Sequence, residues 1–220
     1  MTNAMTNQEL ERSVADELAW DPAVDSETIA VSAESGTITL RGTVGSFRQK
    51  REAQKAAERM YGVTYVNNEL DVRILTEHRR EDAELRGDVL RALMLDTQVP
   101  STVDATVENG IVTLTGTANW QYQRSEAEFV AGNVRGVTGI DNDVYLTAPT
   151  PYAGDVKASI TKALERDAKI EAGNVGVETL SGTAILTGKV HSWAEHDSVV
   201  AAAWAAPGVN NVDDRLEVVY

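Results

Sequence analysis

Three segments of this chain repeat one pattern of glycines and alternating residues. Residues 36–44, 110–118 and 182–190 all read Gly-x-x-x-Leu-x-Gly, and a Gly-Val pair follows each second glycine by 20 residues. The second glycines, Gly42, Gly116 and Gly188, are 74 and 72 residues apart. The 220 residues therefore encode one unit of about 70 residues three times. Units of this size hold small hydrophobic cores, so we expect contacts between the units to stabilise them.

Each unit is predicted to open with an amphipathic helix. Apolar residues recur at positions i, i+4 and i+8, which places them on one face of a helix. Pro22 and Pro100 indicate that the first two of these helices have ended by that point. The residues concerned are Leu10, Val14 and Leu18, then Leu85, Val89 and Leu93, then Val156, Ile160 and Leu164.

A β-hairpin, a second helix and a last strand follow in every unit. Apolar residues alternate with polar ones before and after Ser35-Gly36, Asn109-Gly110 and Ser181-Gly182, and such dipeptides are typical of tight hairpin turns. The second helix is rich in alanine, and the last strand begins at the Gly-Val pair. The sequence therefore predicts an α+β fold of three tandem αββαβ units, each a three-stranded sheet with two helices on one face.

Composition narrows the possible environments and partners. The net charge of −14 disfavours nucleic acid as a partner, and the chain has no cysteine for a disulfide. No segment approaches the roughly 20 apolar residues of a membrane span, and no secretory signal precedes the first helix. We therefore expect a cytoplasmic protein, with a periplasmic or envelope-associated location as the alternative if a signal has been removed.

Each unit resembles a BON domain, a family named for bacterial osmotic-stress and nodulation proteins. The resemblance rests on Val112–Thr117 and its two counterparts, and on an aromatic residue before the second helix: Phe47, Trp120 and Trp193. It also rests on the strand that follows Gly-Val, with Val-Asn-Asn at 66–68, Ile-Asp-Asn at 140–142 and Val-Asp-Asp at 212–214. The predicted BON domains are residues 8–76, 81–148 and 154–220.

The resemblance implies a non-enzymatic role. Family members are associated with envelope stress, with phospholipid or membrane-surface binding and with chaperone-like action, and one cytosolic type binds potassium. The chain also lacks a phosphate-binding glycine loop, a zinc-protease motif and a nucleophile elbow. His191 and His196 are interpreted as surface histidines rather than metal ligands. We expect no catalytic residue, no metal site and no cofactor.

A row of basic residues marks the second helix of the first unit. Arg48, Arg51, Lys55 and Arg59 are spaced to lie on one helix face, where they can contact anionic lipid headgroups. The alternative is a solvated face whose charges are balanced by local ion pairs.

Oxygen-bearing side chains cluster at the start of each last strand. Carboxylate and amide oxygens are ligands for potassium, calcium or magnesium, which makes these residues candidate cation contacts. The alternative is that they cap the entry to the strand. The residues are Asn68, Asp141, Asn142, Asp143, Asp213 and Asp214.

Aromatic residues gather at predicted helix ends. Trp20 and most of the others are expected to pack in the core or between units, whereas Trp120, Gln121 and Tyr122 form a candidate partner patch.

Together these features predict a bacterial stress-related binding protein that acts at phospholipid surfaces or on client proteins. The alternatives are a cytosolic sensor or buffer for potassium or calcium, and a scaffold or self-associating module.

Overall fold

The computed structural model describes residues 5–74, 80–147, 155–168 and 170–220. The domain limits predicted at residues 76, 148 and 154 lie outside these ranges. Contacts divide the chain into two compact units, and the division runs through the middle repeat. One unit comprises Met1–Asp96, Ala105–Leu114 and Glu128–Asp141, and the other Thr97–Asp104, Thr115–Ala127 and Asn142–Tyr220.

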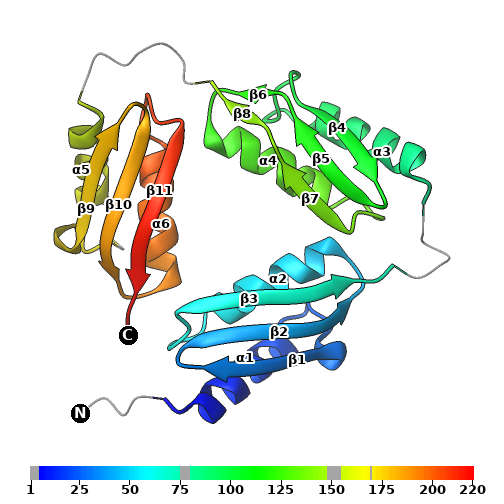
Figure 1. Ribbon diagram of the computed structural model, residues 1–220, viewed down its shortest axis with the longest axis horizontal. Helices are drawn as coiled ribbons and strands as arrows, with labels where there is room; N and C mark the ends of the chain where they lie inside the picture. The colour runs from blue at the N-terminus through cyan, green and yellow to red at the C-terminus, as the bar shows by residue number, and fades with distance from the viewer. Residues whose placement is uncertain (1–4, 75–79, 148–154, 169) are drawn as a thin grey trace. The chain divides into compact units, whose positions relative to one another are not determined.

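The first repeat follows the predicted order of elements (Figure 1). Thr6 caps the first helix, since its hydroxyl accepts the Glu9 N–H while the Glu9 carboxylate accepts the Thr6 N–H. The elements are α1 (Asn7–Trp20), a short 3₁₀ turn (Ser26–Thr28), β1 (Ile29–Glu34), β2 (Thr37–Val44), α2 (Phe47–Glu58) and β3 (Tyr65–Val72).

The sheet of the first repeat has the order β1-β2-β3 and one face covered by helices. Strand β2 pairs antiparallel with β1 and parallel with β3, because α2 carries the chain back before β3 begins. Helices α1 and α2 contact the sheet and each other, as Figure 1 shows. The core between them contains Leu10, Val14, Leu18, Ile38, Leu40, Ala53, Ala56, Ala57, Val63 and Leu70.

The middle repeat has the same elements but a divided sheet. Three strands form a sheet of order β4-β5-β7, and two short strands, β6 and β8, form a parallel pair. Strand β5 ends at Thr115 and β6 begins at Thr117, so the break falls on Gly116. The elements are α3 (Asp82–Leu95), β4 (Asp104–Glu108), β5 (Ile111–Thr115), β6 (Thr117–Ala118), α4 (Gln121–Gly132), β7 (Gly139–Asn142) and β8 (Tyr145–Leu146).

The third repeat restores the continuous sheet, in the order β9-β10-β11. Helices α5 and α6 contact its strands, and Ile160, Leu164, Leu186 and Val199 are fully buried among them. Val156, the first residue of the predicted apolar stripe, is only partly buried. The elements are α5 (Val156–Arg166), a 3₁₀ turn (Ala172–Asn174), β9 (Val175–Leu180), β10 (Thr183–Val190), α6 (Trp193–Trp204) and β11 (Asn211–Val218).

The three hairpin turns confirm the predicted turn chemistry. Ser35, Asn109 and Ser181 have φ of 51°, 53° and 49°, and the glycine after each also has a positive φ. Two consecutive residues with positive φ match the right-handed twist of a two-residue hairpin. The predicted fold of three tandem α+β repeats is therefore confirmed, with the divided middle sheet as the departure from it.

Candidate functional site

The basic row of α2 is largely balanced by acids. The Arg59 guanidinium, at the end of the helix, lies 2.9 Å from an oxygen of Glu17, which is in α1, and 2.8 Å from an oxygen of Asp21, which directly follows α1. Hydrogen bonds that the Arg59 guanidinium donates to Asp21 and Glu17 raise the pKa of Arg59, and the same guanidinium lowers the pKa of Asp21. Arg59 therefore ties the end of α1 to the end of α2.

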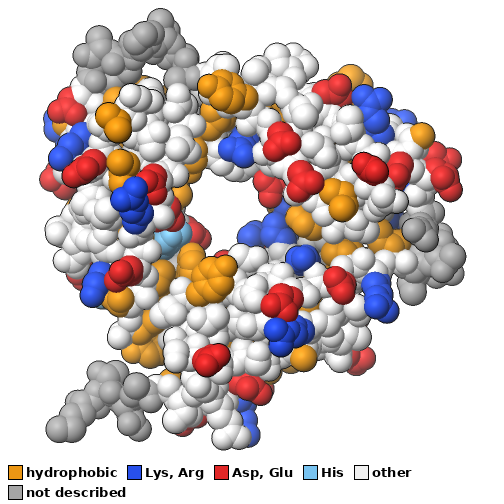
Figure 2. Space-filling view, viewed as in Figure 1, with side chains coloured by type: hydrophobic (Ala, Val, Ile, Leu, Met, Phe, Trp, Pro, Cys, Tyr) orange, Lys and Arg blue, Asp and Glu red, His pale blue; other side chains and the backbone are white. Residues whose placement is uncertain are grey.

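The remaining bases of the row differ in their surroundings. The Lys55 ammonium lies 3.6 Å from a Glu52 carboxylate oxygen, and Arg51 Nε lies 3.9 Å from the same oxygen. Arg48 is exposed and forms no ion pair within the described residues. Acidic and basic side chains are interspersed on the face that Figure 2 shows. The local ion pairs have been observed, whereas a contact between this row and lipid headgroups stays a prediction.

In the first two repeats an asparagine of the last strands, Asn68 within β3 and Asn142 at the end of β7, binds the neighbouring helix. Asn68 Nδ2 donates to the Lys50 carbonyl oxygen of α2 at 2.8 Å, and Asn142 Nδ2 donates to the Arg124 carbonyl oxygen of α4 at 3.0 Å. Each amide oxygen also accepts a backbone N–H two residues further along the chain. Arg124 strengthens the second contact, because its guanidinium donates to the Asn142 carbonyl oxygen at 2.7 Å.

The third repeat replaces this amide contact with an acid–histidine pair. His196 Nε2 lies 2.8 Å from an Asp214 carboxylate oxygen, and His196 Nδ1 lies 3.1 Å from Asp197. The His196 side chain is only 13% exposed, so its interpretation as a surface histidine was wrong, whereas His191 is exposed. Burial lowers the pKa of His196, but the bonds to Asp197 and Asp214 and their charges outweigh that effect and raise the pKa above 6.5.

The other candidate cation contacts are dispersed. Asp213 forms an ion pair with Arg215 at 2.5 Å, which lowers the pKa of Asp213, while Asp141 and Asp143 are exposed. Within the described ranges, no group of three or more His, Asp or Glu side chains is arranged to hold a metal ion. Binding of a cation by these residues stays a prediction.

A second recurring contact was missed by the sequence analysis. The side-chain oxygens of Gln49 and Gln123 accept backbone N–H groups just before their helices, at 2.9 Å from Gly45 N and 3.0 Å from Asn119 N. In the third repeat Glu195 takes this position and is 5% exposed. Its two carboxylate oxygens accept the Glu171 N–H at 2.8 Å and the His191 N–H at 2.7 Å. The sequence did contain a signal for this contact, because a glutamine or glutamate lies seven residues after each of Gly42, Gly116 and Gly188.

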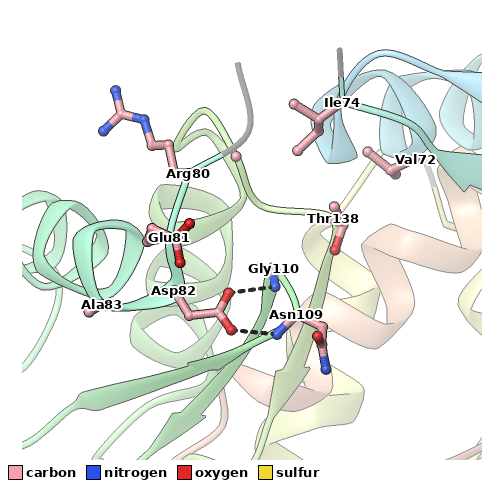
Figure 3. Close-up of a pocket in the computed structure, with 10 residues that line it drawn as sticks. Val72, Ile74, Arg80, Glu81, Asp82, Ala83, Asn109, Gly110 and Thr138 are labelled. Atoms are coloured by element: carbon pink, nitrogen blue, oxygen red, sulfur yellow. Dashed lines mark hydrogen bonds between the residues drawn. The ribbon is translucent and has the colours of Figure 1, made fainter. Parts of the chain in front are cut away.

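Asp82 fastens the start of α3 to the hairpin of the middle repeat. Its carboxylate accepts the N–H of Asn109 at 2.8 Å and the N–H of Gly110 at 3.0 Å, and Figure 3 shows both bonds. Asn7 performs the same task in the first repeat, where its side-chain oxygen accepts the Ser35 N–H at 3.0 Å. These polar side chains therefore hold the hairpin turns in place.

The aromatic residues divide into half-buried and exposed groups. Trp120 and Gln121 of the candidate partner patch are half-buried at the start of α4, and Tyr122 is 55% exposed. Whether this patch binds a partner stays a prediction. Trp20 is 84% exposed, which contradicts an expected place in the core, whereas its packing between units stays a prediction.

Exposed apolar side chains end the first helix of two repeats. Trp20 is the last residue of α1, and Leu95, which is 75% exposed, is the last residue of α3. Met94 beside it is 80% exposed. The sequence indicated where both helices end but not that their last side chains are exposed. In the third repeat Arg166 ends α5 instead.

No helix among the described residues has the length and apolar character needed to cross a membrane.

Comparison with known proteins agrees with the repeated architecture. The family model described as "BON domain" matches residues 6–74, 81–148 and 153–220. Osmotically-inducible protein Y of Escherichia coli (strain K12) is 32% identical over 147 residues, which cover 64% of this chain and 73% of that protein.

Two solved structures of CdsD, a structural protein of the type III secretion system of Chlamydia trachomatis, were also matched. Both are 17% identical, with TM-scores of 0.27 and 0.26; they align with 94% and 98% of this chain and with 91% and 100% of their own chains. These TM-scores are too low to support a conclusion about fold or function. The family model, in contrast, matches nearly the whole chain in three consecutive copies, and the chain therefore belongs to the BON domain family.

Proposed function

We propose that this protein is a non-catalytic, stress-related binding protein that acts at phospholipid surfaces through the exposed helix ends of its first two repeats. The observation that carries the proposal is the shared position of Trp20 and Leu95, each the last residue of its helix and each at least 75% exposed. The osmotically inducible relative supports the connection with stress.

The energetics favour apolar contact over attraction between charges. Full burial of one large apolar side chain contributes about 1.5–3 kcal/mol, so the two helix ends together contribute about 3–6 kcal/mol to binding. The net charge of −14 opposes long-range attraction to an anionic surface. Three of the four bases in the α2 row also lie within 4 Å of an acid. We therefore expect binding to uncharged, zwitterionic surfaces that depends weakly on salt.

Co-sedimentation with phosphatidylcholine vesicles tests this proposal. The double variant Trp20→Ser/Leu95→Ser should lose most of the binding at both low and high salt. Leu180→Ser is the matched control, because Leu180 is an exposed apolar residue (69%) on strand β9 rather than at a helix end. Arg48→Gln should bind as the unmodified protein does.

Other results would contradict the proposal. Binding that appears only with anionic vesicles and disappears in Arg48→Gln would favour the basic row instead. Absence of vesicle binding, combined with suppression of the aggregation of an unfolded test protein, would favour a role on client proteins. Failure of both assays would overturn a surface-binding role altogether.

A further inference from the structure

The same contact between the second helix and the last strand uses different chemistry in the third repeat. Lys50 and Arg124 occupy the same helix position as His196, since they are 74 and 72 residues apart. Asn68, Asn142 and Asp214 likewise share one strand position. Figure 1 shows the elements concerned, which are α2 and β3, α4 and β7, and α6 and β11.

The contacts of the first two repeats contain no titrating group. In both, an asparagine N–H donates to a backbone carbonyl oxygen, and neither group gains or loses a proton near neutral pH. These contacts therefore have the same strength from mildly acidic to mildly basic solution.

The contact of the third repeat is strongest when both ring nitrogens of His196 carry a proton. A carboxylate can only accept, so Asp214 cannot donate to the α6 backbone as an asparagine does. Instead its Oδ2 lies 2.8 Å from His196 Nε2, and its Oδ1 accepts the Leu216 N–H at 3.1 Å. His196 packs edge-on against the Trp193 ring, with 4.8 Å between ring centroids. A doubly protonated imidazole in this position donates to Asp214 and to Asp197 at once.

We infer that the third repeat holds α6 to β11 through a protonation-dependent contact between His196 and Asp214, supported by the neighbouring carboxylate of Asp197 on α6. Mild acid therefore tightens this repeat, and mild base loosens it. The amide contacts of the first two repeats do not respond in this way.

The charged side chains nearest to this contact in the sequence have other partners. Asp213 and Arg215 flank Asp214 on β11, but strand alternation directs them to the opposite face of the sheet, where they pair with each other. Glu195 precedes His196 on α6, and its oxygens bind the backbone of Glu171 and His191 instead. On β10, the residue that pairs with Asp214 is the apolar Leu186. Among the residues that the structure describes, the charged groups that act on His196 are therefore Asp197 and Asp214.

The direction of the effect follows from linkage. The pKa of His196 in the folded chain lies above 6.5, the ordinary value that applies when the chain is unfolded. The stabilisation is therefore complete below pH 6.5 and is lost as the pH rises through the folded-state pKa.

The full-length double variant His196→Arg/Asp214→Asn tests this inference, because it copies Arg124 and Asn142 of the middle repeat into the third. The first measurement is the NMR titration of the His196 imidazole in the unmodified protein, assigned by its loss in the variant. The second is hydrogen exchange of α6 and β11 at about pH 5.5 and about pH 8, on either side of the histidine transition and corrected for intrinsic exchange rates.

In the unmodified protein we expect a titration midpoint above 6.5. The opening constant of α6 and β11 should increase towards pH 8, about tenfold for each unit by which the measured midpoint exceeds the ordinary value. Exchange of α2 and β3 in the first repeat, the internal control, should not change. In the double variant, α6 and β11 should lose their pH dependence.

Two results would overturn the inference: a His196 midpoint at or below 6.5, or an equal pH dependence of α6 and β11 in the unmodified protein and the double variant. If the double variant does not fold, Asp214→Asn alone decides the question, because asparagine already occupies this position twice in the chain. The His196 midpoint should then move down towards that of a histidine without this partner. An unchanged midpoint would contradict the contact.

Discussion

The most demanding backbone position in each repeat is the second glycine of the hairpin motif. In the middle repeat Gly116 has φ of +114°, and a Cβ added there would lie 2.1 Å from the Thr102 carbonyl oxygen. The same addition at Gly42 and Gly188 would lie 1.9 Å from the Thr28 oxygen and 2.0 Å from the Asn174 oxygen. We predict that Gly116→Ala severely destabilises the middle repeat.

The magnitude follows from the local geometry. A non-glycine residue in this backbone region costs about 1–3 kcal/mol. The Thr102 backbone must also move away, which stretches the hydrogen bond of 2.5 Å from its hydroxyl to the Thr117 carbonyl oxygen and costs about 0.5–1.5 kcal/mol. The sum of about 1.5–4.5 kcal/mol is a large part of the stability of a unit of this size, which is about 3–10 kcal/mol.

Gly87→Ala is a matched control within the same repeat. Gly87 is exposed in α3, and an added Cβ there meets nothing within 4 Å. Alanine should therefore stabilise the repeat by about 0.5–1 kcal/mol, so the same chemical change should have opposite signs at the two sites.

Urea unfolding followed by circular dichroism measures both changes, and hydrogen exchange of residues 111–118 assigns them to the middle repeat. A loss of less than about 1 kcal/mol in Gly116→Ala would refute the argument from steric overlap, since strain alone accounts for that much. Equal effects of Gly116→Ala and Gly87→Ala would refute it as well.

Two further predictions concern polar contacts. Glu195→Ala leaves the N–H groups of Glu171 and His191 unpaired and should cost about 1–3 kcal/mol in urea unfolding. Glu195→Gln should be destabilising as well, because glutamine has one acceptor oxygen and its NH2 group would face the second N–H; a stability equal to that of the unmodified protein would contradict this assignment of the two bonds. Arg59→Ala removes ion pairs that are half exposed and should cost no more than about 1 kcal/mol, with a difference that shrinks in high salt; a large effect independent of salt would contradict this view of Arg59.

The fold could be predicted from the sequence because each weak pattern, such as the hairpin motif, occurs three times. A single Val-Thr-Leu-Thr-Gly segment is compatible with many hairpins, but three copies at nearly constant spacing fix the turn and the strand on each side of it. Leu10, Val14 and Leu18 of the first helix stripe are 3%, 0% and 1% exposed, as their periodicity requires. The break in the middle sheet at Gly116 was not predictable, because Gly42 and Gly188 occupy the same position within continuous strands.

The partners of individual side chains were harder to predict from the sequence. His196 was grouped with His191 because they are close in the chain, but the partner of His196 is Asp214 on the last strand. Only the packing of α6 on that strand brings the two together. Trp20 was expected in the core or between units, but the end of α1 projects beyond the core and leaves its side chain exposed.

The third repeat has an acid in place of an amide at two positions: Glu195 where the other repeats have glutamine, and Asp214 where they have asparagine. The two replacements place different demands on the neighbouring hydrogen-bonding groups. At the Gln49 position the side chain only accepts a hydrogen bond, from Gly45 N, so glutamate can replace glutamine without another change. At the Asn68 position the side chain donates to the Lys50 carbonyl oxygen, so aspartate needs a new donor from the helix.

This difference gives a prediction for the first repeat. Gln49→Glu should change the free energy of unfolding by less than about 1 kcal/mol, whereas Asn68→Asp should cost about 1–3 kcal/mol, because it sets a carboxylate against the Lys50 carbonyl oxygen and the Gln54 side-chain oxygen. Adding Lys50→His to Asn68→Asp should restore stability at about pH 6, where a histidine is largely protonated, and not at about pH 8. A double-mutant cycle at the two pH values measures this coupling, and a coupling energy that does not depend on pH would show that the histidine of the third repeat is not the donor that its aspartate requires.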